Sequence, residues 1–98
     1  MFYKIHHAYR DVIAVCDETL IGKIFEEDKF QLEVKESFFK GETASEKELI
    51  EILVDFSKED ATFNIVGEDS IKTALKAGIV EKNGIKKINN IPFALVLV

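Results

Sequence analysis

Residues 45–78 have the sequence SEKELIEILVDFSKEDATFNIVGEDSIKTALKAG, which begins with the signature of a helix N-terminus. Ser45 and Glu48 match a capping box, in which a serine hydroxyl and the glutamate three residues later bind free amides of the first turn. Four apolar residues then recur at helical spacing on one face: Leu49, Ile52, Leu53 and Phe56. This pattern predicts an amphipathic helix that packs its apolar face on a core.

The second half of this stretch predicts a short strand followed by another helix. Residues 62–66 (TFNIV) are rich in β-branched and aromatic types, which favour strands. Gly67 breaks the strand, and apolar residues at helical spacing predict a helix over residues 69–77. Gly78 can adopt the left-handed conformation that ends many helices, so we expect the second helix to end there.

Four segments are apolar runs or alternate apolar and polar residues, which predicts strands over residues 2–9, 12–16, 29–35 and 92–98. Residues 85–88 are expected to pair with residues 92–98 around a turn at Asn89-Asn90, because asparagine tolerates left-handed turn conformations. Phe38 and Phe39 are expected in a loop that covers the core. Strands come first, and the order is then helix, strand, helix, strand. This order predicts the α+β class, with a small mixed sheet of about five or six strands and two helices packed on one face.

The composition indicates one domain that spans residues 1–98. Chains of this length form single domains, and 47% hydrophobic residues suffice for a core. The longest apolar run, residues 91–98, is far shorter than the roughly 20 residues that cross a bilayer. A lone cysteine, Cys16, excludes an intrachain disulfide and suits the reducing cytoplasm. We therefore expect a cytoplasmic protein without a membrane partner.

The formal net charge of −5 is unevenly distributed along the chain. Acidic side chains dominate residues 11–69, whereas lysines dominate residues 70–98. An acidic surface repels phosphate backbones, which argues against duplex DNA as a ligand. The asymmetry is compatible with a protein or ribonucleoprotein partner, and it leaves the oligomeric state open.

Cys16 lies where a predicted buried strand meets a turn, and it admits two interpretations. An accessible thiol with a lowered pKa could act as a nucleophile, with His6 or His7 on the neighbouring strand as its base. A free cysteine more often packs as a small apolar side chain, which is the favoured interpretation. No Cys-x-x-Cys or His-x-x-x-His spacing predicts a metal site, and no cofactor is expected.

The turn at Gly67 offers a different chemistry. A strand that passes through a glycine into a helix N-terminus directs backbone amides outward and can hold a small anion or nucleotide. A single glycine is a weak signal, because phosphate loops carry several. Glu68 and Asp69 also place negative charge at this helix end, where they compete with an anion. A structural turn is favoured, and anion binding is an alternative.

Turns between regular elements are where binding groups usually lie. On this basis we predict one composite binding surface: Cys16, Asp17, Lys23, Gly41, Glu42, Asn64, Gly67 and Glu68. None of these residues is assigned a catalytic role. The leading hypothesis is a non-catalytic binding or accessory module. The alternatives are a thiol-dependent enzyme or redox protein that uses Cys16, and a small-anion or nucleotide binder at Gly67.

The order of short sequence blocks also resembles a known family. The blocks are AVCD at 14–17, LIGK at 20–23, FKGE at 39–42, NIVGE at 64–68 and AGIV at 77–80. Over nearly its whole length the chain is similar to the archaeal family catalogued as domain of unknown function number four hundred and twenty-four. That family has no assigned activity. The resemblance implies a cytoplasmic single-domain protein, from a family whose genes often lie near those of translation factors.

Overall fold

The computed structural model describes residues 1–97, so Val98, the last residue of the predicted strand 92–98, lies outside the described range. The elements in chain order are β1 (Phe2–His6), β2 (Asp11–Cys16), η1 (Glu18–Leu20), β3 (Ile24–Glu27), β4 (Phe30–Glu33), α1 (Glu36–Phe39), β5 (Glu42–Thr43), α2 (Glu46–Ser57), β6 (Ala61–Val66), α3 (Glu68–Ala77), η2 (Lys82–Gly84), β7 (Lys86–Ile88) and β8 (Ile91–Leu97).

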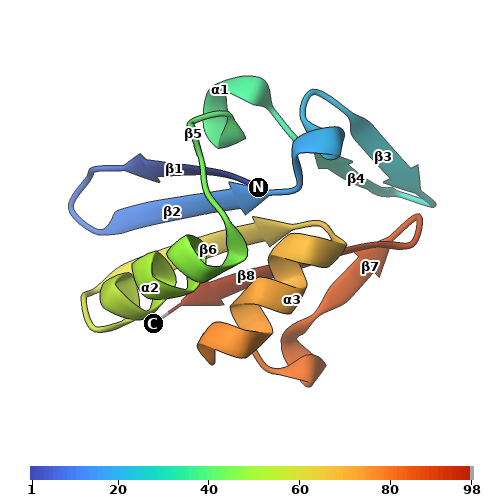
Figure 1. The fold of residues 1–98 in the computed structure, drawn as a ribbon. Coiled ribbons are helices and arrows are strands. Elements are labelled where there is room, and N and C mark those ends of the chain that lie inside the picture. The colour runs from blue at the N-terminus through green and yellow to red at the C-terminus, as the bar shows by residue number, and fades with distance from the viewer. Residues whose placement is uncertain (98) are drawn as a thin grey trace.

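One mixed sheet organises the fold, and its strand order is β5-β1-β2-β6-β8-β7. Strands β2 and β6 are parallel, and the other neighbouring strands are antiparallel. Helices α2 and α3 pack side by side on one face of this sheet (Figure 1). The predicted α+β class, the mixed sheet and the two helices on one face are confirmed, and the sheet has six strands.

Helix α2 begins as its capping box predicts. The Ser45 amide donates to Glu48 Oε1 at 3.1 Å, and the Glu48 amide donates to Ser45 Oγ at 3.2 Å. The hydrogen bond from the Ser45 amide is the main cause that lowers the pKa of the Glu48 carboxyl, because it stabilises the charged form. One turn further on, Leu49 and Leu53 are fully buried against the sheet.

Alternation along the central strands β2 and β6 sends side chains to both faces of the sheet. The residues that face the helices are fully buried and form the main core with α2 and α3: Ile13, Val15, Phe63 and Ile65. The alternate positions, Cys16 and Val66 among them, belong to a second cluster on the opposite face. The two central strands are therefore buried on both faces near their C-terminal ends.

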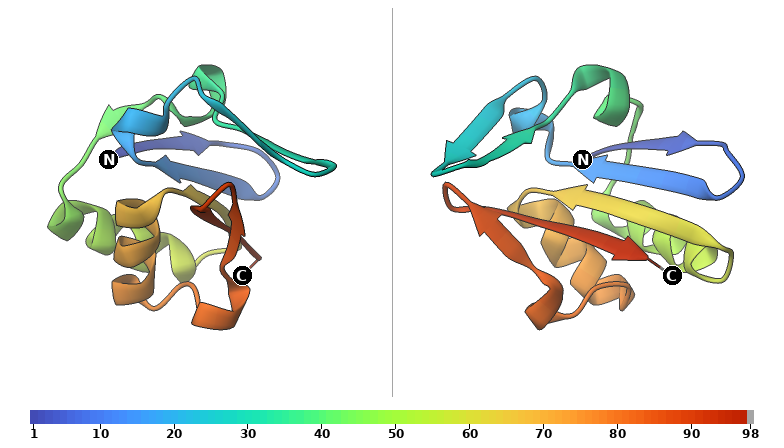
Figure 2. Two further views of the ribbon diagram at one scale, coloured as in Figure 1. Left: turned by 90° about the vertical axis from the view of Figure 1, so that its right-hand side faces the viewer. Right: turned by 180° about the vertical axis from the view of Figure 1, so that it is seen from behind.

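A second, smaller layer covers part of the face opposite the helices (Figure 2). It consists of α1 and a separate two-stranded sheet, β3–β4. Val34 and Phe39 from this layer pack with Cys16 and Val66 of the main sheet. The layer lies toward the C-terminal ends of β2 and β6 (Figure 2), so it leaves the rest of that face uncovered.

The prediction that Phe38 and Phe39 lie in a loop is wrong, because both belong to the short helix α1. Two side chains of β1 bind the carbonyls of this helix. Lys4 Nζ donates to the Ser37 carbonyl at 2.8 Å, and His6 Nε2 lies 2.9 Å from the Phe38 carbonyl oxygen. These long-range bonds stabilise a helix too short to form alone.

The strand predicted over residues 29–35 is shorter than expected and has a different partner. Phe30–Glu33 pairs with Ile24–Glu27 in the separate hairpin and does not join the main sheet. At the other end of the chain, β7 and β8 form the expected hairpin. Asn89 and Asn90 make its turn with φ values of 50° and 65°, which asparagine tolerates.

Candidate functional site

Asp17 and Gly67 lie side by side because the two strands that precede them are parallel and in register, with Cys16 opposite Val66. From there the Asp17 carboxylate reaches the first turn of α3. Its Oδ1 accepts hydrogen bonds from the amide of Ser70 at 2.8 Å and from the Ser70 hydroxyl at 2.7 Å, and its Oδ2 accepts from the Asp69 amide at 3.1 Å. Asp17 therefore caps α3 from a distant part of the chain.

Gly67 makes room for this cap. Its φ of 111° is a conformation that only glycine adopts readily. A Cβ at this position would lie 2.6 and 2.7 Å from the two Asp17 carboxylate oxygens, which is too close for any side chain. The amides proposed for a small anion are thus already bound by a carboxylate. This is the structural turn that the sequence favoured, and its geometry argues against anion binding.

Cys16 packs as an apolar side chain. Its exposed fraction is 0%, and burial, followed by the charge of Asp17, raises the pKa of the thiol to about 12. His6 is opposite Val12 at the far end of the β1–β2 pair, and the exposed His7 contacts Asp11. Neither histidine is placed to act as a base for Cys16. The thiol-dependent alternative therefore lacks both its accessible nucleophile and its base.

The remaining predicted residues lie at separate places. Gly41 allows the chain to approach the Tyr3 carbonyl closely, and Glu42 accepts a hydrogen bond from the Tyr3 hydroxyl at 3.0 Å on the edge strand β5. Lys23 is exposed before the β3–β4 hairpin, where its carbonyl accepts a bond from the Val34 amide.

Of the eight residues predicted to form one surface, the structure brings together Asp17, Gly67 and Glu68 at the start of α3. Cys16 is buried beneath the second layer, and Asn64 lies on the sheet face opposite the helices. Gly41, Glu42 and Lys23 lie elsewhere. The eight residues are therefore not gathered at one place, because Cys16 and Asn64 lie on the sheet face opposite the helices, whereas Asp17 and Gly67 meet at the start of α3.

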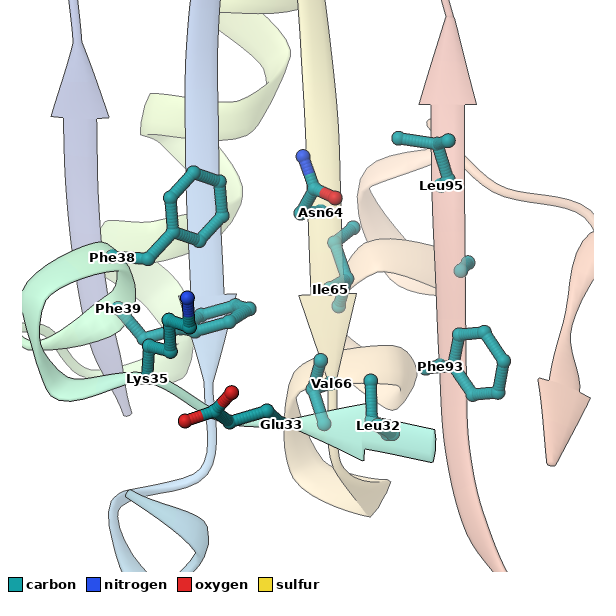
Figure 3. A pocket seen from close by; sticks show the side chains of 11 residues that line it. Leu32, Glu33, Lys35, Phe38, Phe39, Asn64, Ile65, Val66, Phe93 and Leu95 are labelled. Atoms are coloured by element: carbon teal, nitrogen blue, oxygen red, sulfur yellow. The ribbon is translucent and has the colours of Figure 1, made fainter. Parts of the chain in front are cut away.

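The face opposite the helices holds a groove that the sequence did not predict (Figure 3). Its floor is formed by β6 and β8, α1 borders it on one side and β4 closes one end (Figure 3). The groove has a volume of about 330 Å³ and is mainly apolar, with contributions from Leu32, Phe38, Phe39, Phe93 and Leu95. We call it the open-face groove.

A second hollow of about 460 Å³ continues from this groove toward β7. It shares Leu32 and Phe93 with the open-face groove and lies between the β3–β4 hairpin and β7. Phe30, which borders it, is 73% exposed. Leu95 and Leu97 on the same face of β8 are 63% and 70% exposed. Phe30 and Leu95 therefore place exposed apolar side chains at the borders of the two hollows.

The polar groups of the open-face groove are few. Glu33 lies at the end closed by β4, and Lys35, which carries the opposite charge, lies on the side of the groove bordered by α1 (Figure 3). Asn64 lies in the floor, where its side chain is half-buried. Within residues 1–97, no cluster of His, Cys, Asp or Glu side chains could hold a metal ion. The mainly apolar lining of the groove suits an apolar ligand.

Sequence comparison identifies the family. The family described as "Protein of unknown function (DUF424)" matches residues 5–98. The chain belongs to the DUF424 family. This confirms the resemblance carried by the five sequence blocks. No curated protein matches the chain.

A crystal structure of an uncharacterized conserved protein from Methanopyrus kandleri resembles this DUF424 protein. The TM-score is 0.86 at 21% sequence identity, over 98% of this chain and 90% of the other. At this level of identity the likeness establishes the fold alone. Among the residues that the structure describes, no helix is long and apolar enough to span a membrane.

One signal for the groove was present in the sequence of this DUF424 protein. Residues 91–97 are apolar at every position, which predicts a strand buried on both faces. The structure buries Pro92 and Ala94 on the helical side but leaves Leu95 and Leu97 exposed on the other. The apolar run therefore extends beyond the part of the sheet that the second layer covers, and Leu95 in the uncovered part lines the groove.

Proposed function

We propose that this DUF424 protein is a non-catalytic binding module that docks a neutral, apolar segment of a partner protein in the open-face groove. The observation that carries the proposal is the mainly apolar groove from Phe38 across β6 to Leu95, which is interrupted in its floor by Asn64 and which no part of the described chain covers. Exposed apolar areas of this kind on an otherwise well-packed domain mark interaction sites.

The charges around the groove favour a protein segment over a nucleic acid. Glu33 and Lys35 balance each other, and the floor between Phe38 and Leu95 carries no charge, which matches an uncharged ligand. The whole chain has a net charge of −5, which opposes a polyanion. Recognition of RNA needs basic side chains along the bound strand, and Lys35 is the one cation among the residues that line the groove.

The chemistry of the chain's nucleophiles and acids supports a binding role rather than catalysis. The Cys16 thiol is buried with a raised pKa, and the Asp17 carboxylate is bound to the start of α3. The raised pKa of the Tyr3 hydroxyl, caused first by its hydrogen bond to Glu42, leaves that group protonated. The family resemblance and the lone cysteine favour a cytoplasmic partner in the translation machinery, either a protein or the protein part of a ribonucleoprotein.

Differential capture tests the proposal. Three chains are immobilised as baits: wild type, Leu95→Glu and Tyr9→Glu. Leu95→Glu places a charge in the groove. Tyr9→Glu is the matched control, because Tyr9 is fully exposed and lies outside both hollows. We expect a ribosomal or initiation-factor protein that wild type and Tyr9→Glu retain and Leu95→Glu loses. Its purified form should then bind wild type at least about tenfold more tightly than Leu95→Glu.

Two results would contradict the proposal. A partner retained equally by all three baits would not use the groove. A partner released by ribonuclease would show that RNA, and not a protein segment, is the ligand. Circular dichroism of each bait serves as the control that the substituted chains are folded.

A further inference from the structure

Asn64 breaks a local rule of strand composition in the centre of the sheet. It lies in the middle of β6, which is paired on both sides, with Ala14 opposite it on β2 and Leu95 opposite it on β8. Asparagine is depleted in strands, because its carboxamide competes for backbone hydrogen bonds and packs poorly on a pleated surface. Positions that break such a rule without a structural gain are often functional.

The cross-strand neighbours of Asn64, Ala14 and Leu95, have apolar side chains that offer its amide no hydrogen-bond partner. The Asn64 side chain is only half-buried, and its carboxamide opens into the groove. The side chain points out of the sheet into the groove, between Phe38 and Leu95 (Figure 3). A carboxamide carries two donors and an acceptor, which complement the C=O and N–H of one peptide unit.

We infer that Asn64 is a specificity-determining residue that hydrogen-bonds the main chain of an extended protein segment in the open-face groove. The inference rests on the proposed function, since it requires a segment docked there. The segment places apolar side chains on Phe38 and Leu95, while a peptide group between them meets the Asn64 carboxamide. Only an extended chain exposes free N–H and C=O groups at such a point, because a helix uses its own internally.

The inference also specifies what the groove rejects. A purely apolar ligand, or a helix laid in the groove, covers the carboxamide without satisfying it. Burial of an unpaired polar group opposes binding strongly. Asn64 therefore selects against ligands that the apolar walls alone would accept, and this accounts for an amide at a position where valine would pack better.

The test begins with a displayed library of random linear octapeptides, selected on the wild-type chain and counter-selected on Leu95→Glu. Enriched peptides are synthesised, and their affinity is measured by fluorescence anisotropy. The variants are Asn64→Val and, as a second substitution in case valine alters packing, Asn64→Ala. The matched control is Thr62→Val, on the same strand and the same face but not among the residues that line the groove.

We expect enriched peptides to be neutral and aliphatic, and to bind Asn64→Val and Asn64→Ala about tenfold more weakly than wild type, the scale of one lost hydrogen bond with an unsatisfied partner. Thr62→Val should bind like wild type. Methylation of the peptide nitrogen that meets Asn64 should weaken binding to wild type but not to Asn64→Val. The melting temperature of Asn64→Val should equal or exceed that of wild type, which a purely structural asparagine would not allow.

The possible failures are distinguishable. Peptides that depend on Leu95 but bind Asn64→Val as tightly as wild type would overturn the inference and leave groove docking intact. Enrichment of amphipathic helical sequences would overturn it as well, because their main chain cannot reach Asn64. A selection that yields no Leu95-dependent peptide would overturn both the inference and the proposed function.

Discussion

The carboxylate of Asp17 occupies the space that a side chain at position 67 would need, so Gly67 and Asp17 form one structural unit across fifty residues of sequence. The unit ties the end of β2 to the start of α3 and fixes that helix on the sheet. β6 also forms part of the groove floor on the other face of the sheet. The contact between Asp17 and Gly67 therefore stabilises the strand that carries the groove as well as the helix α3.

Gly67→Ala should lower the free energy of unfolding by about 2 to 3 kcal/mol, because a methyl group meets the Asp17 carboxylate and alanine is strained at a φ of 111°. Urea denaturation followed by circular dichroism measures the change. Gly84→Ala is the control, since its φ is not positive and the nearest atom to a new Cβ is 3.9 Å away. If Gly67→Ala were as stable as Gly84→Ala, the close contact between position 67 and the Asp17 carboxylate would not contribute to stability.

A double-mutant cycle separates the collision from the strain. Asp17→Ala alone should cost about 1 to 2 kcal/mol, because the first amides of α3 lose their cap. In that background Gly67→Ala should cost at least about 1 kcal/mol less than in wild type, because the carboxylate is gone and only the backbone strain remains. If the costs of Asp17→Ala and Gly67→Ala simply added in the double mutant, the steric clash between the new methyl group and the Asp17 carboxylate would be contradicted.

The capping box of α2 predicts a pH dependence. The folded pKa of the Glu48 carboxyl is lowered, so its contribution to stability is present above the unfolded pKa of about 4.3 and is lost as the pH falls through the folded value. Wild type should therefore be more stable than Glu48→Gln at pH 7, and the difference should shrink toward pH 3. Urea midpoints at both pH values measure it, with the exposed Glu51→Gln as the control. A difference that grows on acidification would contradict the prediction.

The burial of Cys16 predicts that its thiol is unreactive in the folded chain. Reaction with a thiol reagent at pH 8 should be at least about a hundredfold slower than in the urea-unfolded chain, because the thiolate needs exposure as well as ionisation. Cys16→Ala should leave groove binding unchanged. Rapid labelling of the native protein at low urea concentration would reinstate the thiol-dependent hypothesis.

The parts of the fold that could be predicted from the sequence depend on local patterns. The capping box at Ser45, the helical spacing that follows it and the Asn89-Asn90 turn are each set within a few residues, and each is observed. The second layer was not predictable in the same way. Its hairpin and the helix that holds Phe38 depend on contacts with β1 and with the sheet face, which are distant in sequence.

The candidate site shows the same division. The turns at Asp17 and Gly67 follow from the local sequence, but the contact between the two residues needs the parallel pairing of β2 with β6. The sequence associates Asn64 with the turn at Gly67, whereas its side chain lines the groove on the sheet face opposite the helices. Leu95 is exposed because the second layer covers only part of the sheet. The apolar sequence of β8 does not indicate which of its residues that layer covers.

His6 positions the wall of the groove, and this yields the last prediction. Its imidazole stacks on the Phe38 ring at 4.6 Å between centroids with an interplanar angle of 14°, while its Nε2 lies 2.9 Å from the Phe38 carbonyl oxygen. His6→Ala removes both contacts from a four-residue helix that has little stability of its own. The cost to global stability should be modest, about 1 kcal/mol, because the main core beneath α2 and α3 is untouched.

The larger effect of His6→Ala should be local. Amide hydrogen exchange of residues 36–40 should accelerate by at least about tenfold. Exchange of the β6 amides should accelerate no more than the loss of about 1 kcal/mol in global stability allows. Groove-dependent peptides should bind more weakly, because ordering the Phe38 wall then costs conformational entropy at the moment of binding. His7→Ala is the matched control, since His7 is an exposed neighbour that contacts Asp11 and not α1. If both variants bound peptides equally well, Phe38 would not be a wall that the ligand needs, and α1 would serve only to cover the buried thiol.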